Sequence, residues 1–241
     1  MGYKYCKYSS IGKNRAFNED VIEISEVNDG LLFILCDGMG AEQIDRSASV
    51  LAAKFIRTYF ESENGGNYLE NLNNSIIEAN NFIYNQSNGS SVIKSKPATT
   101  VELLYLKDNF AYIAHIGDSR IYLNKNGKLK QLTKDHSLVQ KLVDEGFLTI
   151  LQAEHHPEKN VVLKALGEKG LIDSDLMKLK LNEYDNNKFF ICSDGVISVL
   201  SNDEISDILT FSNCDKILDT LPQLIKSKGV VDDFSFIYIE N

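Results

Sequence analysis

The sequence lacks the excess of positive charge that a nucleic-acid-binding surface requires. Its 34 acidic residues outnumber its 25 lysines and arginines, which leaves a formal net charge of −9. It also lacks any apolar run near the roughly 18 residues of a membrane-spanning helix. We therefore expect neither nucleic acid nor a membrane among its partners.

Two further absences concern the N-terminal residues MGYKYCKYSS. They lack the apolar core of a secretory signal peptide. Gly2 is followed by Cys6 at the position where an acylation signal requires serine or threonine. We therefore predict a cytoplasmic location.

Cysteine is scarce, with Cys6, Cys36, Cys192 and Cys214 scattered along the chain. None belongs to a C-x-x-C pair or has a histidine at ligand spacing, which argues against structural zinc and a disulfide framework. Cys36 and Cys192 lie in apolar runs, as small buried hydrophobic residues do in a reducing compartment. We assign these cysteines no chemistry.

What the sequence contains is clusters of strand signals flanked by helix signals, with no internal repeat and no Pro-rich linker. At 241 residues and 43% hydrophobic content, we expect one domain over residues 1–241. Apolar residues at helical spacing predict two one-sided helices over residues 44–59 and 69–83. The polar stretch at residues 85–97 predicts a surface loop.

Strand signals predict antiparallel hairpins that turn at Asp29-Gly30, after Lys107 and at Asn126-Gly127. The predicted strands lie in residues 20–36, 100–106, 110–116, 120–132, 188–195 and 234–240. Together with the flanking helices, they predict an α+β sandwich.

Three features outside these strands complete the prediction. Ser201 and Glu204 form a capping box at the start of a helix near Asn202. Another helix covers residues 217–225, where Pro222 predicts a bend or the first turn. Residues 136–166 predict short helices joined by exposed loops, which we name the flap segment.

Four apolar strand segments carry an aspartate at one end. These are Asp37 after LFILC, Asp118 after FAYIAHIG, Asp194 after FFICS, and Asp232 with Asp233 before FSFIYI. A single Asp-Gly pair indicates only a turn. Three of these four strand ends touch glycine, and four aspartates at strand ends indicate a shared function instead.

Carboxylates gathered in one place repel one another unless cations hold them. Two unit charges about 4 Å apart cost roughly 4 kcal/mol at an effective dielectric constant near 20. Carboxylate and carbonyl oxygens suit Mg²⁺ or Mn²⁺ better than zinc. We therefore predict that a strand delivers Asp37 to a metal cluster, where Gly38 leaves room for its own carbonyl to face a metal.

Arg15 lies shortly before Glu19 and Asp20 in GKNRAFNED. A guanidinium beside an acidic metal site is suited to bind a phosphate through two parallel hydrogen bonds. Pairing with Glu19 or Asp20 explains the local sequence equally well. Only the wider set of aspartates favours phosphate binding.

Eight segments occur in the order typical of one enzyme family. They are RAFNED, DGMG, ATT, IGDSRIYL, LTKDHSLVQKLVDEG, HPEKNVVLKALG, FFICSDGV and DDFSFIYI. From about Gly12 to its end, the sequence resembles the metal-dependent protein serine/threonine phosphatases of the PPM (type 2C) family. Its length and Met39 resemble the bacterial branch. The resemblance implies a four-layer α-β-β-α sandwich of two antiparallel sheets flanked by helix pairs.

The resemblance also implies a centre of two Mn or Mg ions. Asp37 would bridge the two metals, Gly38 would supply its carbonyl, and Asp194 and Asp232 would complete the shell of the first metal. Asp118, with Asp194, would serve a third and weaker metal of bacterial members.

The remaining implied roles concern the second metal and the substrate. Glu19 and Asp20 would hold the second metal, mostly through waters, and Arg15 would bind the substrate phosphate. A water shared by the metals would attack phosphorus without a covalent intermediate. The implied partner is a phosphorylated protein that a serine/threonine kinase modifies.

The sequence departs from the family pattern at several positions, none of them an implied metal ligand. They are Ala41, Glu42, Asp45, Arg46, Ala98, Ser198 and Asp233. We therefore expect an active enzyme with an unusual rim around its site. The alternative is a phosphatase-like regulatory module that keeps the metal site without useful turnover. An aspartyl-phosphate mechanism on Asp173 and Asp175 is disfavoured, because that segment lacks the usual glycine and threonine.

Overall fold

Two five-stranded antiparallel sheets form the centre of the computed structural model, which describes residues 2–13, 15–41, 47–63, 65–88, 96–182, 185–211 and 213–241. The first sheet contains, in spatial order, β10 (Asp175–Lys180), β7 (Phe110–Ile116), β6 (Val101–Lys107), β3 (Gly30–Cys36) and β2 (Val21–Val27). The second contains β1 (Lys4–Ser10), β12 (Phe234–Glu240), β11 (Asn187–Cys192), β8 (Arg120–Lys125) and β9 (Lys128–Gln131). A small third sheet pairs β4 (Gly38–Met39) with β5 (Ala98–Thr99).

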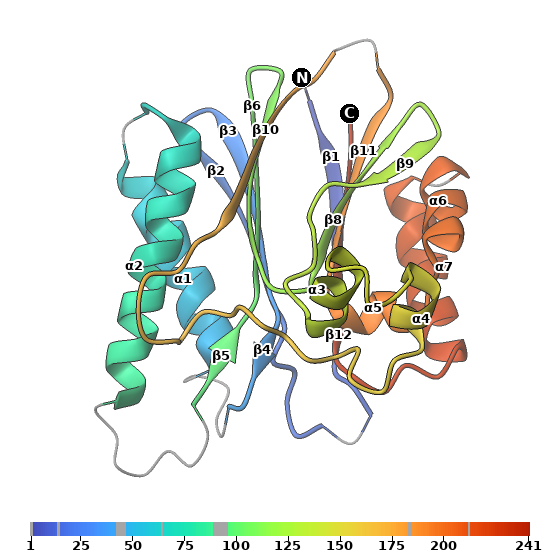
Figure 1. The fold of residues 1–241 in the computed structure, drawn as a ribbon. Helices are drawn as coiled ribbons and strands as arrows, with labels where there is room; N and C mark the ends of the chain where they lie inside the picture. The colour runs from blue at the N-terminus through green and yellow to red at the C-terminus, as the bar shows by residue number, and fades with distance from the viewer. Residues whose placement is uncertain are drawn as a thin grey trace.

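Helices cover the outer faces of both sheets (Figure 1). The first sheet carries α1 (Ala48–Ser62) and α2 (Tyr68–Asn88). The second carries α6 (Asn202–Phe211) and α7 (Cys214–Ser227), and the short α5 (Asp194–Ile197) follows β11. The predicted four-layer α-β-β-α sandwich is therefore confirmed.

The core has three apolar layers because side chains alternate across each strand. In β3, Leu32 and Ile34 belong to the cluster beneath α1 and α2, whereas Phe33 and Leu35 belong to the cluster between the sheets. A third cluster lies between the second sheet and α6 and α7. Strands covered on both faces are apolar throughout, which is why LLFILC shows no polar alternation.

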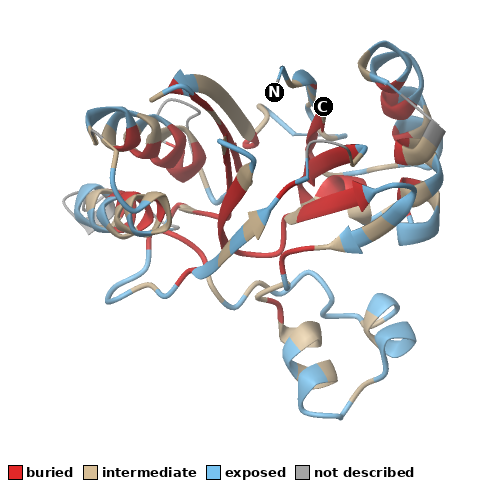
Figure 2. Cartoon of the chain, turned by 90° about the horizontal axis from the view of Figure 1, so that it is seen from above, coloured by how far each residue is buried: buried red, intermediate tan, exposed pale blue. Residues whose placement is uncertain are grey.

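The flap segment contains α3 (Leu138–Asp144) and α4 (Ile150–Glu154), as the sequence predicted. A bridge between Ser137 and Val162 joins the two ends of this segment. Seen from above in Figure 2, these two helices stand apart from the buried layers. Neither helix buries a side chain.

Several local predictions are confirmed by hydrogen bonds. The Ser201 hydroxyl accepts from the Glu204 amide at 3.3 Å, and the Glu204 carboxylate accepts from the Ser201 amide at 3.0 Å. The turn at Asn126-Gly127 has φ values of 52° and 82°, the left-handed region that this hairpin turn requires.

Other local predictions are wrong. The first hairpin turns at Asn28 and Asp29, which have positive φ, so Gly30 is already in β3. Residues 85–88 continue α2 instead of starting a loop. Of the two alternatives for Pro222, the first turn is excluded, because Pro222 lies buried inside α7. The residues predicted to begin the first helix, 44–46, lie outside the described residues. None of the helices in the described ranges is long and apolar enough to cross a membrane.

Candidate metal centre

Asp37 lies at the end of β3, where two threonines of the neighbouring segment hold its backbone. The Thr100 amide donates to the Asp37 carbonyl at 2.9 Å, and the Asp37 amide donates to the Thr100 hydroxyl at 3.1 Å. The Thr99 hydroxyl also donates to the Asp37 carbonyl, at 2.9 Å. These bonds fix the position of the backbone from which the Asp37 side chain extends.

Gly38 follows Asp37 at a point of close backbone approach. A Cβ on this residue would lie 2.7 Å from the Glu19 carbonyl oxygen. The Gly38 amide donates to the same oxygen at 3.2 Å. A side chain at position 38 would therefore push the Glu19 segment away from Asp37.

Asp20 meets Ser193, the residue before Asp194, across the two sheets. Asp20 precedes β2 and Asp194 follows β11, and the Ser193 hydroxyl donates to Asp20 Oδ2 at 2.8 Å. Asp20 Oδ1 is buried and has no hydrogen-bond partner within the described parts of the chain. A buried carboxylate oxygen with no donor is suited to a cation.

Asp118 lies in the turn between β7 and β8, and only 7% of its surface is exposed. The preceding Gly117 has a φ of +119°, and a Cβ there would lie 2.4 Å from the Thr100 Cβ. The Ser119 hydroxyl lies 3.1 Å from the Thr100 hydroxyl. The Asp118 turn therefore packs on the same threonine that holds the Asp37 backbone.

Asp232 and Asp233 precede β12 and take different roles. The Asp233 carboxylate accepts from the Gly12 amide at 2.6 Å and from the Glu19 amide at 2.8 Å. It therefore fastens the segment that carries Glu19 to the second sheet, a role that the sequence did not reveal. The Asp232 carboxylate forms an ion pair with Arg15.

Arg15 pairs with acidic residues at the edge of this group. Besides Asp232, its guanidinium contacts Glu19 Oε2 at 3.5 Å. Of the two local partners that the sequence left open, the structure pairs it with Glu19 and not with Asp20 among the described contacts. Glu19 also accepts from the Ala41 amide at 2.8 Å.

Burial and the charges of neighbouring carboxylates raise the pKa values of these aspartates. Burial and then the charges of Asp20, Asp194 and Asp118 raise the pKa of Asp37 well above its ordinary value. Burial raises the pKa of Asp20 to about 7, with Asp194 as a further cause. Burial and then Asp194 raise the pKa of Asp118 to about 7. Burial and then Asp232 raise the pKa of Asp194.

These side chains form an electrostatic cluster, which we name the acidic centre: Glu19, Asp20, Asp37, Asp118, Asp194 and Asp232. Its donors are oxygens alone, which fits Mg²⁺ or Mn²⁺. In the described residues, however, no three acidic, histidine or cysteine side chains already converge as a finished ligand set. The Asp232 carboxylate is also already paired with the Arg15 guanidinium.

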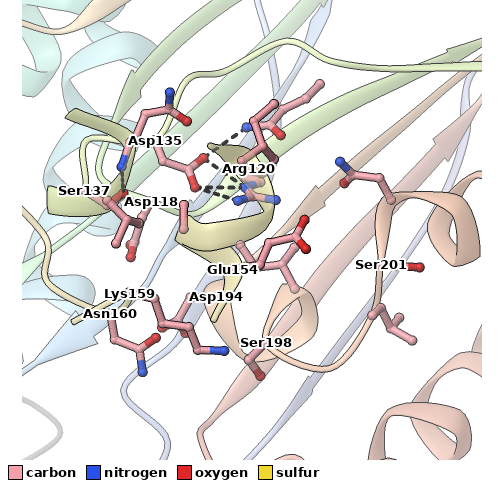
Figure 3. A pocket seen from close by; sticks show the side chains of 18 of the residues that line it. Asp118, Arg120, Asp135, Ser137, Glu154, Lys159, Asn160, Asp194, Ser198 and Ser201 are labelled. Carbon is pink, nitrogen blue, oxygen red and sulfur yellow. Dashed lines mark hydrogen bonds and ion pairs between the residues drawn. The ribbon is translucent and has the colours of Figure 1, made fainter. Parts of the chain in front are cut away.

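A cavity of about 650 Å³ opens beside the acidic centre, between the flap segment and the α5–α6 region. Figure 3 shows Asp118 and Asp194 at one side of it and Ser201 at the other. Its apolar lining comes from both walls: Val139, Val143, Ile150 and Ala153 from the flap segment, and Ile197, Val199 and Leu200 from the opposite side.

A charged pair in this cavity was not predicted from the sequence. Arg120 donates to Asp135 through Nε at 2.9 Å and through a terminal nitrogen at 2.7 Å. Figure 3 shows the pair above Asp118. The signal was the position of both residues next to strand ends, in IGDSRIYL and LTKDHS.

The structure describes some of the residues that depart from the family pattern. Ala98 pairs with Met39 in the small third sheet, and the Ser198 hydroxyl donates to the Gly195 carbonyl at 2.8 Å. Ser198 also lines the cavity. The departures at residues 42, 45 and 46 lie outside the described residues.

Comparisons with known proteins agree with this site. Residues 9–224 match the family model described as protein phosphatase 2C. The chain is 32% identical to protein phosphatase PhpP of Streptococcus pneumoniae over 240 residues, which cover 94% of this chain and 93% of the relative.

Solved structures agree in the same way. The serine/threonine phosphatase PstP/Ppp of Mycobacterium tuberculosis superposes with a TM-score of 0.88 at 29% identity, over 99% of this chain and 98% of that one. The catalytic domain of PstP in complex with two manganese ions superposes with a TM-score of 0.85 at 27% identity, over 99% and 97% of the chains. The chain belongs to the protein phosphatase 2C family of metal-dependent serine/threonine protein phosphatases.

Proposed function

We propose that this chain hydrolyses phosphoserine and phosphothreonine in proteins, with two Mn²⁺ or Mg²⁺ ions at the acidic centre. The observation that carries the proposal is that separate strand ends bring these aspartates together. Thr100 holds the Asp37 backbone and packs on the turn that carries Asp118. Ser193, next to Asp194, donates to Asp20 at 2.8 Å. When bound, the ions supply an activated water and neutralise charge on the phosphate.

The residues of the acidic centre divide into groups. Asp37 would bridge the two ions, and Asp194, Asp232 and the Gly38 carbonyl would complete the set for the first. The fixed Asp37 backbone supports the bridging role, because its three threonine bonds limit how far the carboxylate can move.

Glu19 and Asp20 would hold the second ion. The unpartnered Asp20 Oδ1 supports this assignment. Asp118, with Asp194, would hold a third and weaker ion.

Arg15 would bind the phosphate. Its guanidinium now pairs with Glu19 and Asp232, so a phosphate at the same place would replace one carboxylate contact by two charge-assisted hydrogen bonds. Cations that neutralise Glu19 and Asp232 would weaken their hold on Arg15 and favour this exchange. Met39 cannot donate a proton, so the leaving serine oxygen would take its proton from water.

The substrate polypeptide would run through the cavity beside the acidic centre. Its apolar walls suit apolar side chains near the phosphorylated residue. A serine/threonine kinase would supply the phosphorylated protein. We place the enzyme in the cytoplasm, with neither nucleic acid nor a membrane as partner, because of its net charge of −9 and its lack of long apolar runs.

One assay tests the proposal against the alternatives. Hydrolysis of an aryl phosphate and of a phosphothreonine peptide is measured with manganese, with and without a chelator. We expect turnover that requires metal and is lost in Asp37→Asn. Metal binding without turnover by the wild type would favour a regulatory module. Turnover that survives the chelator and is abolished by Asp173→Asn would favour the aspartyl-phosphate mechanism.

A further inference from the structure

His136 is the first residue of the flap segment and lies against the turn that carries Asp118. Its ring stacks on the His115 ring, with centroids 4.6 Å apart and planes 19° from parallel. His115 is in β7, three residues before Asp118. The proposed catalytic roles do not use either histidine.

The backbone of His136 joins three segments. Its amide donates to the Gly117 carbonyl at 2.7 Å, and its carbonyl accepts from the Leu163 amide at 2.7 Å. Leu163 lies near the other end of the flap segment. One residue therefore ties both stems of the flap segment to the Asp118 turn.

The side chain of His136 completes this connection. Its Nδ1 accepts from the Gly117 amide at 3.1 Å, which requires that Nδ1 carry no proton. The proton of the neutral ring then sits on Nε2, which lies 3.4 Å from Asp175 Oδ1. Gly117 is buried, so loss of this acceptor would leave a buried N–H without its partner.

Buried neighbours favour the neutral ring. His115 Nδ1 lies 2.6 Å from Glu102 Oε1, and His115 Nε2 donates to the Lys134 carbonyl at 2.9 Å. The His115 and Glu102 residues are each at most 1% exposed. Burial and then the charge of His115 lower the pKa of His136 to about 4, which agrees with the hydrogen-bond geometry.

The connection extends to the acidic centre through Gly117. This glycine packs on Thr100, and Thr100 holds the Asp37 backbone. A shift of the Gly117 turn would therefore move Asp118 directly. It would also displace Thr100, which holds the Asp37 backbone.

We propose that His136 is a positioning residue that fixes the flap segment to the Asp118 turn through its unprotonated Nδ1. Its effect on catalysis rests on the proposed phosphatase function, whereas the structural connection does not. The cavity wall and the acidic centre then keep one relative arrangement while a substrate binds between them.

The test uses three substitutions of His136 in the full chain. The amide oxygen of Asn can take the place of Nδ1, whereas the longer Gln reaches the place of Nε2, and Phe supplies neither acceptor. We expect His136→Gln and His136→Phe to lower kcat/KM for a phosphothreonine peptide about tenfold, the effect of one lost hydrogen bond to a buried donor. They should also raise the manganese concentration for half-maximal turnover of an aryl phosphate. His136→Asn should restore both quantities.

Amide hydrogen exchange on metal-free protein gives a readout that is independent of activity. The Gly117 amide should exchange faster in the Gln and Phe variants and stay protected in the wild type and in His136→Asn. Protection of Gly117 in His136→Gln, or equal loss of protection in the Asn and Gln variants, would overturn the proposal. If the wild type has no metal-dependent turnover, the phosphatase function fails, and the exchange pattern still decides whether His136 forms this connection.

Discussion

β3 and β11, which end at the acidic centre, are buried on both faces, whereas α3 and α4 of the flap segment bury no side chain at all. Figure 2 shows this contrast between the buried layers and the projecting helices. Phe147, between α3 and α4, is 71% exposed. Buried strands can hold charged ends against their mutual repulsion, and a segment without a core can adapt to a polypeptide. With the proposed function, the buried strand ends would hold the site of hydrolysis and the flap segment would form a wall of the substrate-binding cavity.

Asp37→Asn gives the largest expected effect, on the rigid side of this comparison. Loss of the carboxylate that we propose as the bridge between the metals should lower metal-dependent aryl phosphate hydrolysis by about 10²- to 10³-fold or more. The metal-free variant should melt no lower than the wild type, because one repelling carboxyl is removed. Asp219→Asn, an exposed substitution on α7, is the matched control and should change neither quantity.

Arg15→Ala should have the next largest effect. Loss of charged hydrogen bonds to the phosphate should lower kcat/KM by about 10- to 100-fold and weaken inhibition by inorganic phosphate. Arg15→Lys keeps the charge without the forked geometry, so its activity should lie between the two. Arg57→Ala on α1 serves as the control. Unchanged phosphate inhibition in Arg15→Ala would exclude this residue from phosphate binding.

The acidic centre predicts an unusual pH dependence of stability in metal-free protein. The pKa values of Asp20 and Asp118 are raised from an ordinary 3.8 to about 7. Between these values the folded protein binds more protons than the unfolded chain, so these groups lower the free energy of unfolding as pH rises from about 4 to about 7. His115, with a raised pKa of about 8, acts in the same direction, whereas His136 opposes it.

Bound manganese should reverse this loss of folding stability at neutral pH. At a manganese concentration 100 times the dissociation constant, the native state gains about 2.7 kcal/mol, which raises Tm by about 5 to 10 °C. Thermal melts at pH 5 and pH 7.5, with and without manganese, measure both effects. Asp118→Asn should flatten the pH dependence of the metal-free melts. A metal-free Tm that rises steadily over this range would contradict the proposed coupling.

The smallest effect is expected in the flap segment. Phe147→Ser should change the free energy of unfolding by no more than about 0.5 kcal/mol, as exposed substitutions do. Aryl phosphate hydrolysis should not change, because Phe147 does not line the cavity. Leu104→Ala, in the fully buried cluster between the sheets, should instead cost about 2 to 5 kcal/mol. Equal losses in the two variants would remove the contrast between core and flap segment.

The sequence predicted the central strands of the two large sheets and missed two of their four edge strands. β3 and β11 are covered on both faces, so their apolar runs stand out. β1 and β10 are edge strands with many exposed side chains, and neither was predicted from the sequence. An edge strand needs less apolar character, and pairing with a neighbour then determines its conformation.

The acidic residues show a similar division. Their positions at strand ends made Asp37, Asp118, Asp194 and Asp232 recognisable from sequence. Asp233 looked like a departure from the usual asparagine, yet it binds the Gly12 and Glu19 amides more than 200 residues away. No local pattern reports a partner at that distance.

The sequence by itself determined the strand and helix periods, the turns and capping box, and the aspartates at the ends of apolar strands, because each depends on neighbours a few residues apart. Only the tertiary structure decided which carboxyls face one another, that Arg15 pairs with Glu19 and Asp232, and that His136 joins the flap segment to the Asp118 turn. The Ser193 hydroxyl and Asp20 are 173 residues apart and hydrogen-bond only because the two sheets pack face to face. Contacts of this kind depend on how the layers stack, which is set by the whole core.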